Sequence, residues 1–210
     1  MRKKIEYLDS LGKIITQHEA SQLNDHEQRH YIDERLKEVV IYWDKQIQSS
    51  SVFIYPDENL NQELEKLDSN ISYAVAKDMQ VINNYTVWLY YSYKNGILST
   101  DFFQTRVFES NNKIIAIEAP NLNLVEKTYY LQGKHVLNEE EELDFVYQED
   151  DDITFVFKNG ELKISTFNPW DGNLSPGEFQ GTYQDRLPFM TQEIFEYFTK
   201  PEPLIPPVEL

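Results

Sequence analysis

The sequence YTVWLYYSYKNGIL, residues 85–98, combines an aromatic strand pattern with a turn at Asn95-Gly96. Asn-Gly is the strongest short hairpin pattern, because a type I′ turn needs positive φ at both central residues. The expected register pairs three residues across this turn: Tyr93 with Leu98, Tyr91 with Thr100 and Leu89 with Phe102. One face of the hairpin is then almost entirely apolar. We therefore expect its aromatic side chains to form part of a core.

A second turn of the same kind, Lys158-Asn159-Gly160, lies within the most regular alternating pattern of the chain. Alternation of apolar and polar residues is typical of an antiparallel sheet with one side in water. The residues expected on its apolar face are Ile153, Phe155, Phe157, Leu162 and Ile164. With further strand patterns at 113–118 and 124–131, the sequence predicts an antiparallel meander of about six or seven strands from Tyr85 to Thr166.

Helices are predicted on both sides of this meander. Residues 1–50 are expected to be helical, because apolar residues recur there at spacings of three and four. That stripe consists of Ile32, Leu36, Val39, Trp43 and Ile47. Asp57 is expected to cap a second helix carrying Leu60, Leu64, Leu67 and Ile71, with the helical stripe continuing to Asn84. A last helix is expected to begin at Thr191 and to end at Lys200-Pro201.

The predicted fold class is therefore α+β, with a helical N-terminal third packed on an antiparallel sheet. A length of 210 residues favours one compact domain with an appendage. We expect a single domain over 1–210, composed of a helical segment at 1–50, a body at 51–200 and an extended, proline-rich tail at 201–210.

The charge balance is the clearest compositional feature. Nineteen Lys and Arg stand against 36 Asp and Glu, which gives a net charge of −17. Fourteen Tyr and 12 Phe indicate a packed core and argue against a disordered acidic chain. Direct binding to nucleic acid or to an anionic membrane surface is disfavoured, because both carry the same sign of charge. The excess charge is explained either by solubility or by attraction of a basic partner.

The sequence also indicates the cellular compartment in which the protein is expected. It contains no cysteine, which excludes a disulfide scaffold and any thiolate metal site and agrees with a reducing environment. The first residues are basic, but Glu6 and Asp9 interrupt any apolar stretch of the kind found in a signal peptide. No run approaches the roughly 18 apolar residues of a membrane-spanning helix. We expect a cytoplasmic protein.

One catalytic pattern is present, at His26-Glu27-Gln28-Arg29-His30. On a helix, the two histidines of H-E-x-x-H lie one turn apart and hold Zn²⁺, while the glutamate activates water. Here both histidines lie away from the apolar stripe of the predicted helix, a charged Arg29 lies between them, and no third ligand is evident. A solvated helix face carrying two histidines explains the pattern better than a zinc site does, so we assign no metal site and no catalytic residue.

The most distinctive polar segment is Asn138–Asp152, in which nine of fifteen residues are acidic and none is basic. Its apolar centre separates two acidic clusters, and rigid aromatic residues flanked by carboxylates suit an interface for a basic protein. The predicted partner-binding residues are Glu139, Glu140, Glu141, Glu142, Asp144, Tyr147, Glu149, Asp150, Asp151 and Asp152. An equally simple alternative is a charged edge that protects a sheet from aggregation.

These observations favour an acidic intracellular protein that binds and neutralises a basic protein partner, without a cofactor. An immunity protein against a nuclease-type toxin, or a nucleic-acid mimic, has this profile. Two alternatives stay open: a zinc-dependent hydrolase that uses His26, Glu27 and His30, and a small-molecule-binding domain with a pocket lined by Tyr and Trp between sheet and helices. No catalytic constellation points to an enzyme, and the sequence leaves the oligomeric state open.

Overall fold

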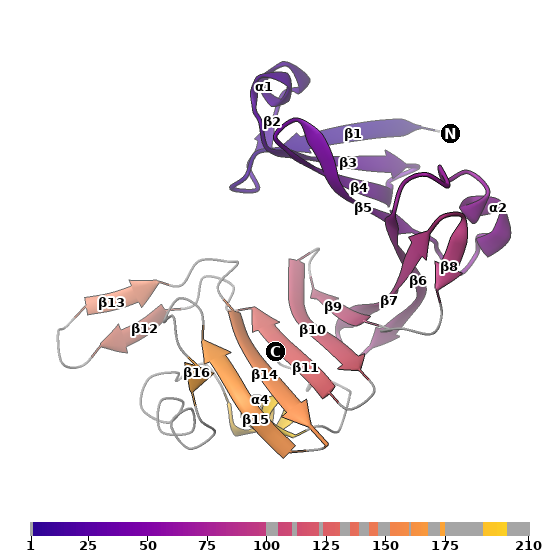
Figure 1. The fold of residues 1–210 in the computed structure, drawn as a ribbon. Helices are drawn as coiled ribbons and strands as arrows, with labels where there is room; N and C mark the ends of the chain where they lie inside the picture. The colour runs from indigo at the N-terminus through magenta and orange to yellow at the C-terminus, as the bar shows by residue number, and fades with distance from the viewer. Residues whose placement is uncertain are drawn as a thin grey trace. The chain divides into compact units, whose positions relative to one another are not determined.

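The computed structural model describes residues 2–99, 105–110, 113–121, 124–130, 135–138, 143–146, 152–159, 161–167, 173–174 and 191–200. Strands dominate these residues (Figure 1). The first eight strands are β1 (Lys3–Leu8), β2 (Ile14–Ile15), β3 (His26–Ile32), β4 (Arg35–Trp43), β5 (Gln46–Phe53), β6 (Tyr73–Ile82), β7 (Tyr85–Lys94) and β8 (Ile97–Ser99). The others are β9 (Thr105–Ser110), β10 (Lys113–Asn121), β11 (Leu124–Tyr130), β12 (His135–Asn138), β13 (Leu143–Val146), β14 (Asp152–Lys158), β15 (Glu161–Phe167) and β16 (Asn173–Leu174).

The same residues contain three short helices, α1 (Gln17–Gln22), α2 (Leu60–Leu64) and α4 (Gln192–Thr199). None of these three has the length and apolar content needed to cross a bilayer. Helix α4 agrees with the prediction. Its N-cap is Thr191, whose hydroxyl accepts a hydrogen bond of 3.3 Å from the backbone N–H of Ile194. The predicted tail at 201–210 lies outside the described residues.

The predicted α+β fold class, with its helical N-terminal third, is wrong. Apart from the six residues of α1, the regular structure between residues 2 and 53 in the described chain consists of strands. The apolar stripe from Ile32 to Ile47 is divided among β3, β4 and β5. Tight turns interrupt it at Asp33-Glu34 and Asp44-Lys45, where all four residues have positive φ. Residues 39–43 of β4 are β-branched or aromatic, and such residues favour a pleated, half-buried surface over a helix.

The predicted second helix is also largely wrong. Helix α2 spans only five residues, and its N-cap is Asn59, whose side chain accepts a hydrogen bond from the N–H of Gln62. The helical stripe expected as far as Asn84 is instead strand β6. A turn beginning at Asn83, with φ of 54°, then leads into β7.

Hydrogen-bonded neighbours form one long, open and mostly antiparallel sheet in the described chain. Its order is β16-β15-β14-β11-β10-β9-β7-β6-β5-β4-β3-β1-β2, with β8 paired to β7 outside this path. The pairing of β5 with β6 is parallel, because residues 54–72, which include α2, connect them. Nine strands are described between Tyr85 and Phe167, more than the six or seven predicted. Strands β12 and β13 form a separate two-stranded pair.

The chain divides into two compact units, Met1–Met79 with Leu89–Phe102, and Gln80–Trp88 with Phe103–Leu210. The first, called unit 1, has a core of Val52, Ile54, Val75 and Tyr93, against which the leucines of and around α2 pack. The second, unit 2, has a larger core, described below. Strands β6 and β7 contribute residues to both units, so this division does not by itself test the predicted single domain.

The first predicted hairpin is confirmed where the structure describes it. Asn95 and Gly96 have φ of 52° and 77°, and Tyr93 lies opposite Leu98. The other two predicted pairs involve residues 100 and 102, which lie outside the described residues. Tyr85, Val87, Tyr91 and Tyr93 are buried on one face of β7, Leu89 is half-buried, and Trp88 is buried on the other face. The aromatic strand therefore belongs to the scaffold.

The second hairpin is confirmed with one correction. Asn159 has φ of 54°, and Phe157 lies opposite Leu162. A bulge next to this pair then shifts the register, so that Ile164 lies opposite Val156 and not opposite Phe155. Ile164 therefore does not take the register position that strict alternation assigns to it.

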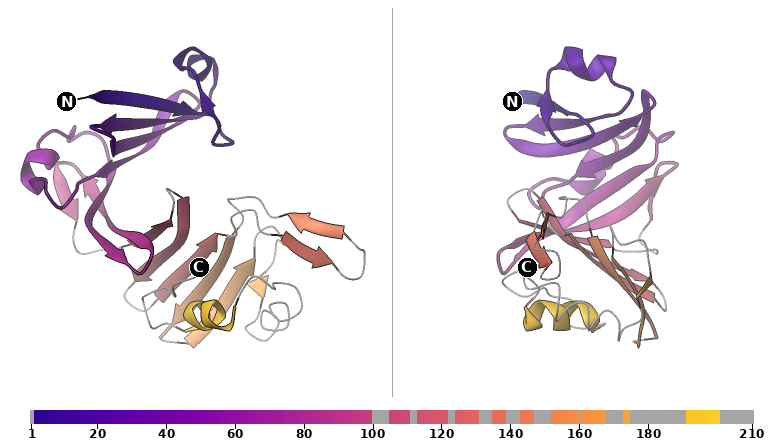
Figure 2. Two further views of the ribbon diagram at one scale, coloured as in Figure 1. Left: turned by 180° about the vertical axis from the view of Figure 1, so that it is seen from behind. Right: turned by 90° about the vertical axis from the view of Figure 1, so that its left-hand side faces the viewer.

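Two cross-strand rows build the core of unit 2. One consists of Phe108, Ala116, Tyr129 and Ile153, and the next of Arg106, Glu118, Lys127 and Phe155. Helix α4 lies against one face of this sheet (Figure 2) and contributes its buried residues Ile194 and Tyr197 to the same core. Three members of the second row are charged, although they lie among apolar neighbours.

Candidate functional site

The predicted acidic segment lies mostly outside the described residues. Strands β12 and β13 are antiparallel, with Asn138 opposite Leu143, and the chain between them carries the four glutamates 139–142. Asp144 is placed on β13 opposite Leu137, and Asp152 begins β14 and is half-buried. Of the predicted site residues, only Asp152 has a described side chain, so the convergence of these residues stays a prediction.

Charge is distributed unevenly along the chain. Residues 1–100 contain 11 Lys and Arg and 15 Asp and Glu, whereas residues 101–210 contain 8 and 21. In the described part of the first hundred residues, seven carboxylates have a cationic or histidine partner within 4 Å: Glu6, Glu27, Glu38, Asp57, Glu58, Glu63 and Asp78. In the second half, acidic residues exceed Lys and Arg by 13, so most of them cannot be paired one to one within that stretch.

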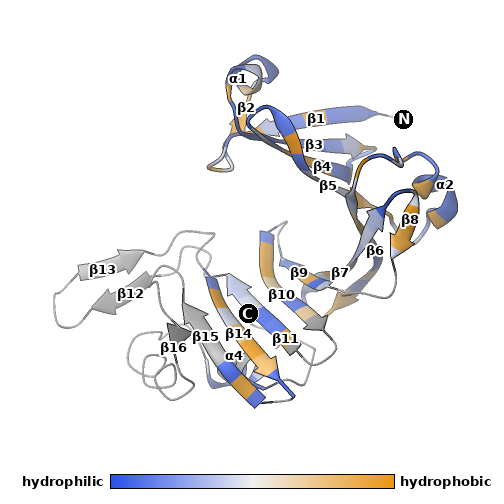
Figure 3. Cartoon of the chain, viewed as in Figure 1, coloured by the Kyte–Doolittle hydropathy of each residue, from blue (hydrophilic) through white to orange (hydrophobic). Residues whose placement is uncertain are grey.

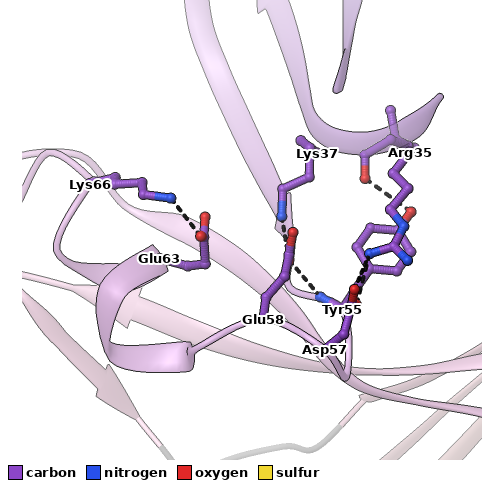
Figure 4. Close-up of polar contacts among 8 residues, drawn as sticks. Arg35, Lys37, Tyr55, Asp57, Glu58, Glu63 and Lys66 are labelled. Atoms are coloured by element: carbon purple, nitrogen blue, oxygen red, sulfur yellow. Dashed lines mark hydrogen bonds and ion pairs between the residues drawn. The ribbon is translucent and has the colours of Figure 1, made fainter. Parts of the chain in front are cut away.

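Figure 4 shows one of the paired regions in unit 1. Arg35 donates hydrogen bonds of 2.7 and 2.8 Å to the two carboxylate oxygens of Asp57, and Lys37 donates to Glu58. Both cations also lie beside the ring of Tyr55, at 4.9 and 5.6 Å from its centroid. The backbone N–H of Tyr55 donates to Glu58. These contacts fix the segment before α2 to β4 and leave few free charges there.

The H-E-x-x-H pattern lies on strand β3, not on a helix. Along a strand, side chains alternate, so His26 and His30 share one face with Gln28 between them, while Glu27 belongs to the other face. The Cα atoms of His26 and His30 are then about 13 Å apart, too far for both to reach one Zn²⁺ at roughly 2 Å. The residues do not match the helical arrangement that a zinc hydrolase hypothesis required.

The contacts of the two histidines are structural. The ring of His26 stacks on Tyr42 at a centroid distance of 4.5 Å, and burial lowers its pKa. His30 Nδ1 lies 3.8 Å from Oε2 of Glu38, and the other carboxylate oxygen of Glu38, Oε1, accepts a hydrogen bond of 2.9 Å from the hydroxyl of Ser50. Among the residues that the structure describes, no group of three His, Asp or Glu side chains is placed to hold a metal ion.

Unit 1 contains an open groove of about 620 Å³ near α1. Its lining residues are Asp9, Ser10, Leu11, Ile15, Glu19, Gln22, Leu23, Asn24 and Asp25. The three carboxylates are used locally: Asp9 accepts from Leu11 and Lys13, Glu19 completes the capping box of α1, and Asp25 accepts from the N–H of Asp44. No Tyr or Trp lines this groove, so it differs from the predicted small-molecule pocket.

The most unusual polar feature is a buried cluster in unit 2, formed by Arg106, Glu118, Lys127 and Tyr197. Glu118 of β10 lies opposite Arg106 of β9 and opposite Lys127 of β11, which gives charges of alternating sign across three strands. Glu118 is 1% exposed and Lys127 is 0% exposed. Charged residues are rarely buried to this extent unless they have partners.

Helix α4 supplies these partners. Lys127 Nζ donates a hydrogen bond of 2.7 Å to the backbone carbonyl of Tyr197 and lies 4.1 Å from the centroid of the tyrosine ring. The hydroxyl of Tyr197 donates to Oε1 of Glu118. Arg106 Nη1 lies 3.8 Å from Oε2 of Glu118, too far for a hydrogen bond, and Oε2 has no hydrogen-bond partner.

The electrostatics of the cluster follow from this geometry. Burial raises the pKa of Glu118 to about 7, because the contacts with Tyr197, Lys127 and Arg106 only partly offset the loss of water. Burial, reinforced by the neighbouring Glu118, also raises the pKa of Tyr197. Since both carboxylate and ammonium groups are inaccessible to water, the cluster is suited to holding α4 in place rather than to binding a substrate.

Sequence reasoning missed this cluster, although one signal was available. Val125, Lys127 and Tyr129 occupy alternate positions of β11, and Val125 and Tyr129 are apolar or aromatic while Glu126 and Thr128 are polar. Lys127 therefore stands at an inward position of the alternating pattern. Its anionic partner could not have been identified from that pattern, because the pairing of β10 with β11 and the position of α4 are tertiary features.

Comparison of the chain with models of known protein families, with curated proteins and with solved structures found no match. The function is therefore inferred from the residues of this chain.

Proposed function

We propose that this chain is an acidic binding protein that neutralises a basic protein partner, as an immunity protein against a nuclease-type toxin or a nucleic-acid mimic does. The observation that carries the proposal is the excess of 13 acidic residues over Lys and Arg in residues 101–210. An excess of this size produces a negative field that attracts a cationic surface and repels nucleic acid and anionic lipid. The partner-binding residues proposed are those of the acidic segment, Glu139–Glu142, Asp144, Tyr147 and Glu149–Asp152.

Two structural observations support this choice of segment. Strands β12 and β13 pair only with each other in the described chain, so their hairpin is not part of the long sheet. In unit 1, by contrast, six carboxylates form ion pairs with Lys or Arg of the same unit. Paired carboxylates contribute little to a long-range field, whereas a segment with nine acidic residues and no Lys or Arg of its own can steer a basic protein towards its aromatic residues.

The salt dependence of binding tests the proposal. The basic partner is captured on the immobilised protein at low ionic strength, and the association and dissociation rates are measured from about 50 to 300 mM salt. We expect the association rate to fall by at least roughly tenfold over this range, with a smaller change in dissociation. Where the captured partner is a nuclease, its activity should be inhibited in the same stoichiometric complex. A binding constant that does not depend on salt would contradict the electrostatic proposal.

A matched pair of variants then locates the interface. Glu140→Gln with Glu141→Gln removes two charges from the acidic segment, and Glu34→Gln with Glu65→Gln removes two exposed charges from unit 1. Only the first pair should slow association, by about three- to tenfold. If the two pairs of substitutions slow association equally, the partner is attracted by the net charge of the protein and not by the acidic segment in particular. If the first pair instead leaves binding intact and causes self-association, the segment protects a sheet edge.

A further inference from the structure

Helix α4 is held against its sheet by polar contacts that lead to one buried carboxylate. Tyr197, near the carboxyl end of the helix, donates its hydroxyl proton to Glu118 and offers its backbone carbonyl to Lys127. The apolar side of the same helix places Ile194 in the core that contains Phe155. The helix therefore covers both apolar residues and a titratable group, so the charge on that group affects how firmly the helix is held.

We propose that Glu118 is a proton-operated latch for α4, which stays docked while Glu118 is protonated and loosens when Glu118 ionises. Ionisation is costly here because Oε2 is buried and has no hydrogen-bond donor. The charged and titratable groups that face the site are Arg106 from β9, Lys127 and Tyr129 from β11, Tyr197 from α4 and Tyr85 from β7. Of these, only Tyr197 donates a hydrogen bond to the carboxylate, and it donates to Oε1.

When Glu118 ionises, movement of α4 away from the sheet is the least costly way to bring water to its carboxylate. The carboxylate lies on a central part of the sheet, between β9 and β11, and cannot leave without breaking strand pairing. Helix α4 has only eight residues, and its movement away from the sheet would admit water at much lower cost. Its departure also removes Ile194 from the apolar core of unit 2, so the latch controls the exposure of apolar residues of that core.

The direction of the switch follows from linkage. In the docked state the pKa of Glu118 is about 7, and in contact with water it returns towards its ordinary value of 4.5. The docked state therefore binds a proton more tightly than the loosened state, and acidification favours docking. Between pH 5 and pH 8 the ratio of loosened to docked helix is expected to rise by about 50- to 100-fold, most of it below pH 7.5.

A spin label on α4 tests the latch directly. The chain contains no cysteine, so Gln192→Cys provides a single attachment point at an exposed position of the helix. Electron paramagnetic resonance spectra of the labelled, full-length protein are recorded from pH 5 to pH 8.5, and circular dichroism checks that the sheet persists. We expect the mobile fraction of the label to grow with pH, with a midpoint near 7.

Three variants make the result decisive. Glu118→Gln keeps a neutral acceptor for Tyr197 and should remove the pH dependence, leaving the label immobile throughout. Tyr197→Phe removes the hydroxyl that stabilises the ionised form, so it should move the midpoint to higher pH. Glu193→Gln, which neutralises an exposed carboxylate of the same helix, should behave as the parent. The proposal is overturned if the parent shows no transition, or if Glu118→Gln retains it.

Discussion

Lys127 on β11 donates a hydrogen bond of 2.7 Å to the backbone carbonyl of Tyr197 on α4, although 70 positions separate the two residues in the chain. The last carbonyl groups of a helix have no partner within the helix, and the carboxyl end of its dipole attracts a positive charge. Lys127 meets both needs from a neighbouring strand. A residue that is unfavourable to bury thus becomes the means by which a short helix is fixed to the sheet.

Replacement of this lysine should be destabilising. Lys127→Met keeps most of the length of the side chain but leaves the buried carbonyl of Tyr197 without its donor. Below pH 7 Glu118 is protonated and does not become an unpaired charge, so the expected cost is that of an unsatisfied buried carbonyl, about 1–3 kcal/mol. Urea denaturation of Lys127→Met and of the control Lys163→Met, an exposed residue of β15, measures the difference. The control should change the free energy of unfolding by less than about 0.5 kcal/mol, and a similar effect of both variants would contradict the role given to Lys127.

The free energy of unfolding should depend on pH through Glu118. The pKa of this group is raised from 4.5 to about 7 by folding, so the native state holds a proton that the unfolded state has released between these values. Its contribution is fully present below about pH 4.5 and is lost as pH rises through 7, which amounts to about 3 kcal/mol at most. Denaturation curves of the parent and of Glu118→Gln at pH 5, 6, 7 and 8 isolate this contribution from the general effect of net charge. Parallel curves for the two proteins would show that Glu118 does not titrate in this range.

The turn between β4 and β5 offers a stabilising substitution. Lys45 has φ of 61°, which costs an ordinary residue roughly 1 kcal/mol or more, whereas Asp-Gly is a preferred pair for a type I′ turn. Lys45→Gly retains the backbone hydrogen bond of 2.8 Å to the carbonyl of Asn24. We expect the midpoint of thermal unfolding to rise, with a gain of about 0.5–1 kcal/mol. Lys94→Gly, at the end of strand β7, should instead lower it, because glycine weakens a strand.

Burial decides which aromatic residues stabilise unit 1. Tyr93 is 4% exposed and packs edge to face with Tyr73, at a ring distance of 6.0 Å. Its replacement by alanine should cost about 3–5 kcal/mol. Trp43 is larger but is 61% exposed at the end of β4, so Trp43→Ala should cost less than about 1 kcal/mol. Chemical denaturation of the two variants provides the comparison, and a larger loss for Trp43→Ala would show that it has a packing role.

The errors in the N-terminal region have a specific cause. Apolar residues from Ile32 to Ile47 recur at helical spacing only because turns at Asp33-Glu34 and Asp44-Lys45 interrupt a strand pattern. Strands β1 and β3 are also mostly hydrophilic (Figure 3), so they lack the regular apolar alternation that identifies a strand. Neither turn contains the glycine that made the two Asn-Gly turns easy to recognise.

The two candidate sites also differ in how much of each could be predicted from the sequence. The acidic segment was recognised from composition, and its role stays a proposal because most of it lies outside the described residues. The buried cluster was missed because its carboxylate, its lysine and its tyrosine lie on three elements, with up to 79 positions between Glu118 and Tyr197. The alternation in β11 marks Lys127 as inward, but only the packing of α4 shows what that lysine binds.

The features that could be read from the chain alone were local ones: the Asn-Gly hairpins, the alternating strands that follow them, the Thr191 cap of α4 and the acidic balance. Each depends on the conformational preference or charge of residues close together in sequence. The strands of the first fifty residues, the parallel pairing of β5 with β6 and the buried ionic cluster depend on tertiary structure. Their stability comes from contacts between distant segments, and such contacts override weak local preferences once the strands are paired.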